Sequence, residues 1–249
     1  MSLNTNNKNK EVWAIIPARS GSKSVKDKNI MLLSAHPMIA YTINIALQCS
    51  NISRVIVTTD SKYYADIALK YGAEVPFLRP ENISEDSSKD IEFFQHAVDW
   101  FKKEEGYAPE YFVHLRPSTP IRSPILIDQA IEEFLCSDYS ALRSVHKMSD
   151  TSYKTFEIED GKLKTLFNGS FDIEFTTMPR QTFPVTFNPN GYIDIVRTSM
   201  IENGLMHGNN VKAFITDTTY EIDEMDDFNF LEYMVSKNPN LLSLFSIKN

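Results

Sequence analysis

The stretch Val12-Trp13-Ala14-Ile15-Ile16-Pro17-Ala18-Arg19-Ser20-Gly21-Ser22-Lys23-Ser24-Val25-Lys26-Asp27-Lys28-Asn29 joins an apolar run of strand length to a loop rich in serine, glycine and cations. Backbone N–H and ammonium groups in such a loop can turn toward a polyphosphate. The stretch carries neither the P-loop pattern Gly-x-x-x-x-Gly-Lys-[Ser/Thr] nor the three glycines of the dinucleotide-binding fingerprint. It therefore predicts a buried strand over 12–17 and a phosphate-binding loop of another kind. The alternative is a surface connection with solvated lysines.

The composition is that of an ordinary globular protein, because 42% of the 249 residues are hydrophobic and 23% are charged. This length suits one large α/β domain, alone or with a small appendage. The formal net charge of −8 argues against nucleic acid or an anionic membrane as a partner. Residues 1–10 are polar and are expected to form a flexible tail, and no apolar run is long enough to span a bilayer. Cys49 and Cys136 are expected to be reduced thiols, so we expect a cytoplasmic protein.

Apolar runs of strand length alternate with segments of helical periodicity through the first half of the chain. The predicted strands cover 12–17, 54–60, 74–78 and 111–115, and the predicted helices cover 37–50, 61–71, 89–105 and 123–136. This alternation predicts a Rossmann-like, three-layer α/β domain whose mostly parallel sheet is covered on both faces. Ligands of such sheets bind beyond the carboxyl ends of the strands. Three of the four loops expected there carry arginine, namely 19–28, 79–88 and 116–122.

A change of pattern near residue 147 predicts an insertion. The α/β domain is expected over 11–146 and 188–249, and residues 147–187 are expected to form a small β-rich insertion. Asp160-Gly161 between alternating segments predicts a hairpin over 152–166, and several aromatic residues follow it. Because so many aromatic side chains need a cover, we expect a dimer interface here. The alternative is that these side chains pack back onto their own sheet.

Further along, strands are predicted over 190–197 and 211–215, and a last helix is predicted to end near residue 236. Just before that helix, Glu221 and Asp223 are separated by one residue, which places both carboxylates on the same side of an extended segment. Such a pair suits Mg²⁺, and an acidic pair facing a cationic loop is what nucleotidyl transfer requires. Capping of the last helix is the alternative, which we prefer for Asp226 and Asp227. The five histidines show no zinc-ligand spacing, and Ser22 is interpreted as a loop donor.

Seven short motifs then occur in order along 12–235: Ile16-Pro17-Ala18-Arg19-Ser20-Gly21-Ser22-Lys23 with Lys28-Asn29, Val57-Thr58-Thr59-Asp60, Leu78-Arg79-Pro80, Leu115-Arg116-Pro117-Ser118-Thr119-Pro120-Ile121-Arg122, Pro179-Arg180-Gln181, Pro189-Asn190-Gly191 and Glu221-Ile222-Asp223. In this order they closely resemble the acylneuraminate cytidylyltransferases, the CMP–sialic acid synthetases, whose fold is of the nucleotide-diphospho-sugar transferase type. The related Kdo cytidylyltransferases share that fold, but their opening loop is usually richer in leucine, threonine and arginine.

The resemblance implies that a 2-keto sugar acid attacks the α-phosphate of CTP through its anomeric oxygen, with Mg²⁺, and that pyrophosphate is released. It implies catalytic roles for Arg19, Lys23 and Asp223, and metal binding by Asp223 and Glu221. The implied nucleotide-binding residues are Arg19, Ser22, Lys23, Lys28, Asn29, Arg79, Asp86 and Ser88. The implied acceptor-binding residues are Arg116, Ser118, Thr119, Lys154, Arg180, Asn190 and Asp194. Lys154 and Arg180 match positions on the family's dimerisation element, so each site of a homodimer would borrow them from the other subunit.

The chain departs from the family pattern around the acceptor. Arg116 replaces the usual glutamine, Asn188 replaces a frequent arginine, and Asp194 stands where the family tends to tyrosine. Glu221 replaces the more usual aspartate in the metal pair. These departures leave the nonulosonic acid open, and a legionaminic or pseudaminic acid is a candidate beside N-acetylneuraminate. Two alternatives stay open: a different acceptor, either a Kdo-like acid or a phosphorylated small molecule, and a non-catalytic nucleotide-binding protein.

Overall fold

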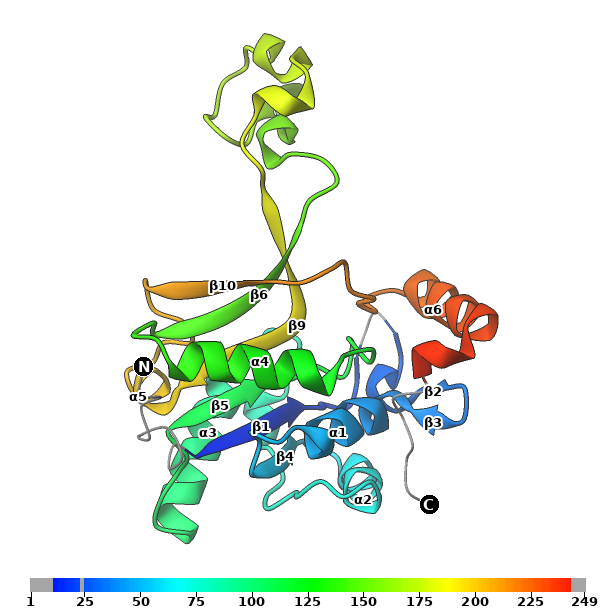
Figure 1. Ribbon diagram of the computed structural model, residues 1–249, viewed down its shortest axis with the longest axis vertical. Coiled ribbons are helices and arrows are strands. Elements are labelled where there is room, and N and C mark those ends of the chain that lie inside the picture. Colours follow the sequence, from blue (N-terminus) through cyan, green and yellow to red (C-terminus); the bar gives the residue numbers. More distant parts are fainter. Residues whose placement is uncertain (1–10, 23–24, 243–249) are drawn as a thin grey trace, which may run out of the picture.

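The computed structural model describes residues 11–22 and 25–242. Its centre is a six-stranded sheet in which every strand except β9 runs in the same direction (Figure 1). In spatial order the strands are β10 (Val211–Ile215), β6 (Ala141–Lys147), β9 (Phe187–Arg197), β5 (Tyr111–His114), β1 (Val12–Pro17) and β4 (Arg54–Thr58). The predicted α/β fold with a mostly parallel sheet is therefore confirmed.

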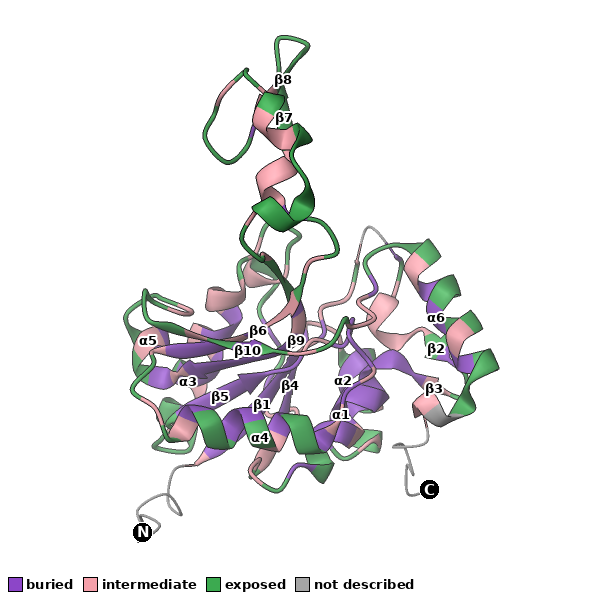
Figure 2. Cartoon of the chain, turned by 45° about the horizontal axis from the view of Figure 1, so that its top comes forward, coloured by how far each residue is buried: buried purple, intermediate pink, exposed green. Residues whose placement is uncertain are grey.

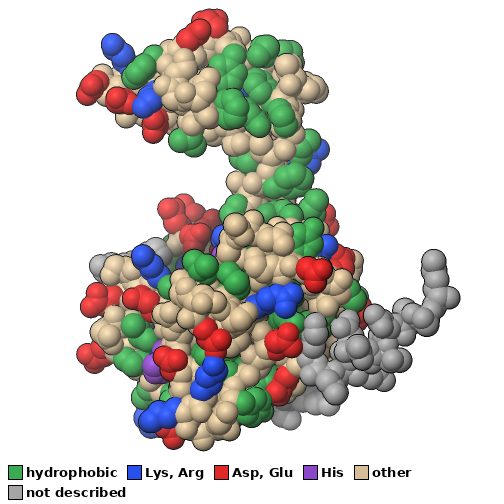
Figure 3. All heavy atoms as spheres, turned by 90° about the vertical axis from the view of Figure 1, so that its left-hand side faces the viewer, with side chains coloured by type: hydrophobic (Ala, Val, Ile, Leu, Met, Phe, Trp, Pro, Cys, Tyr) green, Lys and Arg blue, Asp and Glu red, His purple; other side chains and the backbone are tan. Residues whose placement is uncertain are grey.

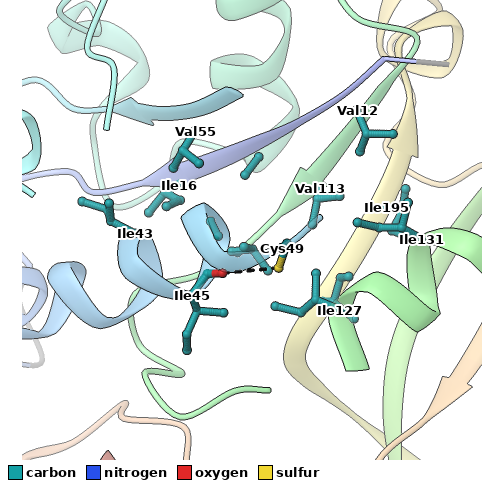
Figure 4. Close-up of a cluster of buried hydrophobic side chains, with 14 of the residues drawn as sticks. Val12, Ile16, Ile43, Ile45, Cys49, Val55, Val113, Ile127, Ile131 and Ile195 are labelled. Atoms are coloured by element: carbon teal, nitrogen blue, oxygen red, sulfur yellow. Dashed lines mark hydrogen bonds between the residues drawn. The ribbon is translucent and has the colours of Figure 1, made fainter. Parts of the chain in front are cut away.

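Successive residues of β1 face two different cores, which is why this strand reads as a continuous apolar run. Val12, Ala14 and Ile16 belong to a core shared with α1 (Met38–Gln48), α2 (Lys62–Lys70) and α4 (Pro124–Leu135) (Figure 4). Trp13 and Ile15 belong to a second core, shared with α3 (Asp90–Glu104) and α5 (Thr198–Glu202). The sheet is thus covered on both faces, in three layers (Figure 1).

A smaller lobe packs beside this domain through a third core. It contains Leu33, Met38 and Tyr41 together with apolar residues of the last helix, α6 (Met225–Lys237). The lobe also includes the short hairpin of β2 (Leu32–Leu33) and β3 (His36–Pro37), and the 3-10 helices η2 (Lys28–Ile30) and η7 (Pro239–Leu242). Because η2 ends the phosphate-binding loop, this packing ties that loop to α6. Among the described residues, no helix has the length and apolarity needed to cross a membrane.

The strand predictions failed in two places: one predicted strand is largely absent, and one strand was not predicted. The strand predicted over 74–78 is reduced to isolated bridges at Glu74 and Leu78, because Pro76 between them has no N–H to donate to a ladder. Strand β6 was not predicted. A bulge between Arg143 and Val145 shifts its pairing with β9 and breaks the period-two alternation that would have marked it.

The insertion stands away from the domain on a two-stranded stalk (Figure 1). The stalk is the outer part of β6 and β9, where Val145–Lys147 pairs with Phe187–Pro189 in antiparallel register. Beyond it lies the hairpin of β7 (Phe156–Glu159) and β8 (Lys162–Thr165), whose turn residues Asp160 and Gly161 both have positive φ. The predicted hairpin is confirmed.

Strand character in the insertion is limited to that hairpin. The remainder holds short 3-10 helices: η4 (Ser152–Lys154), η5 (Glu174–Thr177) and η6 (Arg180–Thr182). Another, η3 (Glu81–Ile83), lies in the main domain. Residues of the insertion are mostly exposed or half-buried (Figure 2). Apolar side chains gather on its surface (Figure 3), and its exposed large hydrophobics include Ile158, Leu163, Leu166, Phe167 and Phe171.

Candidate functional site

A cleft of about 220 Å³ lies beyond the carboxyl ends of β1 and β5, at the edge of the sheet where parallel α/β domains bind ligands. Cations gather in it from three segments that lie far apart in the sequence. It is lined by Pro17, Arg19, Ser22, Lys28, Asn29, Arg79, Ile83, Glu85, Ser88, Lys89, Asp90, Phe93, Arg116, Pro117 and Ser118. The structure thus brings together most of the predicted nucleotide-binding residues. Lys23 lies outside the described residues.

The phosphate-binding loop is held in shape from both ends. At its start, the backbone N–H and hydroxyl of Ser20 donate hydrogen bonds of 2.7 and 2.6 Å to the Asp60 carboxylate, which follows β4. At its end, the amide nitrogen of Asn29 donates to the Arg19 carbonyl at 3.1 Å. Lys28 lines the cleft, and its Nζ donates to the Ile222 carbonyl at 2.8 Å. The two described ends of the loop are therefore anchored to Asp60 and to the segment that contains Ile222.

Arg79 forms a buried cationic wall of the cleft and is only 5% exposed. Its guanidinium donates to the Thr58 carbonyl at 2.7 Å and to the Thr58 hydroxyl at 3.2 Å, and it lies 4.9 Å from the Phe93 ring centre. Burial lowers the pKa of Arg79 to about 10, so the side chain stays charged at neutral pH. The side chain thus presents a fixed positive charge beside an aromatic ring.

The loop over 84–88 closes the cleft on the side of the phosphate loop. Asp86 forms an ion pair of 2.5 Å with Arg19, and each side chain is about one-third exposed. Ser88 lines the cleft, whereas Asp86 lines a neighbouring hollow together with Ser20 and Asp60. The predicted nucleotide-binding residue Asp86 therefore lies beside the cleft and forms an ion pair with Arg19, one of the arginines that line it.

Arg116 also lines the cleft, and its guanidinium lies between two carboxylates. Its Nη2 donates to Asp90 Oδ2 at 2.9 Å, and its Nη1 donates to Asp194 Oδ2 at 3.2 Å. Asp90, at the start of α3, lines the cleft, whereas Asp194 on β9 is only 1% exposed. Behind them His114 is fully buried, and burial with nearby arginines keeps its pKa well below the usual range. His114 is therefore neutral and supplies no charge to either aspartate.

A buried arginine that the sequence did not single out holds the turn over 116–122. Arg122 is 2% exposed and donates to the Arg116 carbonyl at 2.8 Å, the Gly191 carbonyl at 3.0 Å and the Tyr192 carbonyl at 2.6 Å. It also contacts the carbonyl of Thr119. Burial lowers the pKa of Arg122 to about 9. These contacts indicate a structural role for Arg122, because its N–H groups donate to backbone carbonyls of the loops that form the site.

The acidic pair joins the cleft through the backbone, since the N–H of Ile222 donates to the Ser118 carbonyl at 2.8 Å. Burial, and then the neighbouring Asp223 carboxylate, raise the pKa of Glu221. Asp223 is exposed and lies 3.4 Å from Lys28 Nζ. Asp227 instead accepts from the backbone N–H groups of Asp223 and Glu224 at 3.0 and 2.8 Å, so the capping interpretation of Asp227 is confirmed.

The donor chemistry of this pair fits a hard cation. Two neighbouring carboxylates that repel each other, close to a cleft lined by cations, match the oxygen ligands that Mg²⁺ takes. Within the described ranges, no group of three or more His, Cys, Asp or Glu side chains is arranged to hold a metal. Glu221 and Asp223 therefore supply at most part of a coordination shell, and phosphate oxygens and water would have to complete it.

Several predicted acceptor-binding residues lie outside the cleft. Thr119 and Asn190 are buried beneath it, and Asn190 donates to the Thr216 hydroxyl at 2.7 Å. Lys154 and Arg180 lie in the insertion, where Lys154 Nζ lies 5.5 Å from the Phe183 ring centre and Arg180 donates to the Met148 carbonyl at 2.8 Å. The insertion stands off the domain (Figure 1), so these two cations are not brought into the cleft of their own chain.

Solved structures share this fold at low sequence identity. One is a CMP–2-keto-3-deoxy-manno-octonic acid synthetase complexed with CTP, with a TM-score of 0.68 and 16% identity. The match covers 91% of this chain and 99% of that structure. Another is a 4-diphosphocytidyl-2C-methyl-D-erythritol synthase from Anaerococcus prevotii, with a TM-score of 0.62 and 14% identity. That match covers 94% of this chain and all of that structure. These likenesses concern the fold.

Sequence relatives are similar over nearly the whole chain. The N-acylneuraminate cytidylyltransferase of Escherichia coli is 32% identical over 94% of the chain, which spans only 55% of that enzyme. The post-translational flagellin modification protein B of Campylobacter coli is 32% identical, with 93% of the chain and 97% of the relative covered. A CMP-N,N'-diacetyllegionaminic acid synthase of Campylobacter jejuni is 33% identical, with 91% and 95% covered. Residues 13–169 also match the cytidylyltransferase family as a whole. The chain belongs to the cytidylyltransferase family.

Proposed function

We propose that this cytidylyltransferase transfers CMP from CTP to the anomeric oxygen of a nonulosonic acid. The observation that carries the proposal is the contact between the predicted phosphate loop and the acidic segment, where Lys28, which lines the cleft, contacts Ile222 and Asp223. Relatives named for N-acylneuraminate, diacetyllegionaminic acid and pseudaminic acid support the acceptor class. In the reaction the anomeric oxygen bonds to the α-phosphorus, the bond from that phosphorus to the bridging oxygen breaks, and pyrophosphate leaves.

The nucleotide would occupy the end of the cleft that the phosphate loop forms. Arg19, Lys28 and Asn29 would hold the triphosphate and ribose, together with Ser22 and the predicted Lys23. Arg79, the Phe93 ring beside it and Ser88 would enclose the cytidine. The positive charge of these fixed side chains would stabilise the charge that builds up on the phosphate oxygens in the transition state.

Mg²⁺ is the cation that we propose for the acidic pair. Asp223 and Glu221 would hold it, and when bound it supplies positive charge at the phosphate oxygens. Lys28, which lines the cleft, donates to the Ile222 carbonyl between these two residues and so links the acidic pair to the cleft. Charge repulsion between Glu221 and Asp223, which contributes to the raised pKa of Glu221, would be relieved on binding.

The acceptor would lie at the Arg116 and Ser118 end, toward the stalk. We propose that the exposed apolar surface of the insertion pairs with that of a second copy, and that Lys154 and Arg180 reach the partner's cleft. The open position of both residues away from their own cleft supports this arrangement. We also propose a cytoplasmic location, which the free thiol of Cys49 supports.

Pyrophosphate release from purified protein with CTP and Mg²⁺ tests the proposal. Acceptors should include N-acetylneuraminic, legionaminic and pseudaminic acids, a Kdo-type acid and a phosphorylated alcohol, with ATP, GTP and UTP replacing CTP as controls. We expect release with CTP and at least one nonulosonic acid. Release with only the Kdo-type acid or the phosphorylated alcohol would overturn the acceptor class. Tight CTP binding without release from any acceptor would indicate a non-catalytic nucleotide-binding protein.

A further inference from the structure

Two of the positions at which this chain departs from the acylneuraminate pattern contact each other. Arg116 follows β5 and Asp194 lies on β9, 78 residues further along the chain, yet Arg116 Nη1 donates to Asp194 Oδ2 at 3.2 Å. The other terminal nitrogen of the same guanidinium, Nη2, donates to Asp90 Oδ2 at 2.9 Å. The guanidinium is thus fixed in plane by two carboxylates, one on α3 and one on β9.

Asp194 is an unusually placed carboxylate. It is 1% exposed, and its Oδ1 accepts no hydrogen bond from the described residues, although Arg143 Nε lies 3.7 Å away. The neutral His114 gives it no compensating charge. Burying a carboxylate is costly unless a cation pairs with it, so the Arg116 contact is its main hydrogen-bonded compensation. The pairing therefore fixes where the Arg116 head can lie.

Arg116 keeps donors for a ligand. A guanidinium has five N–H groups, and the two contacts above use two of them. The side chain is about one-quarter exposed and lines the cleft. Arg116 and the two carboxylates that it bridges, Asp90 and Asp194, together carry no net positive charge. Around Arg116 the cleft therefore offers directed N–H donors rather than a general attraction for anions.

We propose that Arg116 determines acceptor specificity by donating hydrogen bonds to an oxygen of the sugar acid, and that Asp194 is the positioning residue that aims it. The inference rests on the proposed function, because it assigns the acceptor to the Arg116 end of the cleft. Two oxygens of a nonulosonic acid have the required chemistry, namely the carboxylate and the carbonyl of an acylamido group. Both accept from a fixed planar donor, and the test separates them.

The test is a double-mutant cycle with Arg116→Lys and Asp194→Asn, read as KM for the acceptor against KM for CTP. Arg116→Lys keeps the charge but cannot bridge two carboxylates. We expect each single variant to raise the acceptor KM about tenfold, with the CTP KM within about twofold. Adding Asp194→Asn to Arg116→Lys should cost little more, because the positioned group is already gone. The matched control is Arg143→Gln, which removes the other cation beside Asp194 but does not line the cleft, and it should leave the acceptor KM within about twofold.

Acceptor analogues identify the oxygen. The deacylated acceptor and the methyl ester of the intact acceptor are each assayed with wild type and Arg116→Lys. The analogue on which the two enzymes agree is the one in which the contacted group, the acylamido carbonyl or the charged carboxylate, has been removed. Equal losses from Arg116→Lys on both analogues would overturn the contact. So would additive effects in the cycle, or an acceptor KM raised equally by Arg143→Gln. Should Asp194→Asn fail to fold, the acceptor KM of Arg116→Lys and Arg116→Gln decides alone. Wild-type protein that turns over no nonulosonic acid would overturn the proposed function itself, and this inference with it.

Discussion

At the scale of single residues, Lys28 links the predicted phosphate loop to the proposed metal-binding segment, because its Nζ contacts Ile222 and Asp223. We expect Lys28→Ala to lower kcat/KM for CTP by about a hundredfold, because a fixed charge at the phosphates is lost. Its hydrogen bond to Ile222 should cost only about 1 kcal/mol of the free energy of unfolding. Pyrophosphate release and thermal unfolding check both. Lys26→Ala, an exposed lysine of the same loop that does not line the cleft, is the control. Equal loss in both variants would contradict the assignment.

Glu221 gives a prediction with a definite dependence on pH. Its raised pKa means that ionised Glu221 destabilises the folded chain, at a cost that is absent below the ordinary carboxyl pKa and grows as pH rises through the folded value. Glu221→Gln should therefore raise Tm by a few degrees at neutral pH without metal, and by less at acidic pH. Added Mg²⁺ should stabilise wild type more than the variant. Thermal unfolding at both pH values, with and without Mg²⁺, checks this, and a lower Tm of the variant at neutral pH would contradict it.

The sequence was informative about residues whose role is carried by local pattern. Arg19, Lys28 and Arg79 are cations of loops that were predicted to follow strands, and Asn29 was implied by the family resemblance; all four line one cleft. Arg122 and Asp90 were not, because their importance arises from contacts between segments that only the folded chain brings together. No spacing rule indicates that Arg122 will be buried beneath several carbonyls. For Asp90, its position at the start of a helix after an arginine-containing loop was the available signal.

At the scale of elements, the loop over 84–88 is tied to the phosphate loop by Asp86 and Arg19. Since Arg19 is a proposed triphosphate ligand, CTP must compete with this ion pair. We expect Asp86→Asn to lower the KM for CTP about two- to fivefold, the usual worth of a partly exposed pair. Initial rates over a range of CTP concentrations check this. A higher KM would instead support a direct contact of Asp86 with the nucleotide, as the sequence predicted.

Elements with strong periodicity or a definite turn signal were predicted well. The first four helices were predicted within a few residues of their ends, and Asp160-Gly161 marked its hairpin because both residues accept positive φ. Strand β6 was missed because its bulge disrupts alternation, and residues 166–186 lack any period that could assign them. In that segment aromatic contacts replace regular hydrogen bonding, as when Tyr153 packs on Phe167 and Phe183.

At the scale of the whole molecule, the insertion exposes apolar side chains that a single copy leaves uncovered. We expect Ile158→Lys with Leu166→Lys to convert a dimer into a monomer, measured by sedimentation, because the lysines would place charge in an apolar contact. Pyrophosphate release should fall at the same time. Lys237→Ala, an exposed lysine on α6, is a control for altered surface charge. A wild-type monomer with full activity would contradict the paired arrangement.

A shared site gives a second prediction at this scale. Chains carrying Lys28→Ala and chains carrying Arg180→Ala should each be nearly inactive alone. After mixing and exchange of subunits, half of the dimers would be mixed, and each would contain one cleft with both residues intact. Recovery to about one-quarter of wild-type activity is expected. Absence of recovery, with exchange verified by mass spectrometry, would place Arg180 outside the partner's cleft.

The central claim is that the chain joins CMP to a sugar acid, and the structure of the product tests it most directly. Phosphorus NMR of a completed reaction with CTP, Mg²⁺ and a nonulosonic acid should show equal amounts of pyrophosphate and one new phosphodiester. Carbon coupling should place that phosphodiester on the anomeric carbon. Free CMP with unchanged sugar acid would mean that the protein hydrolyses CTP, and a phosphodiester at any other carbon would contradict attack by the anomeric oxygen.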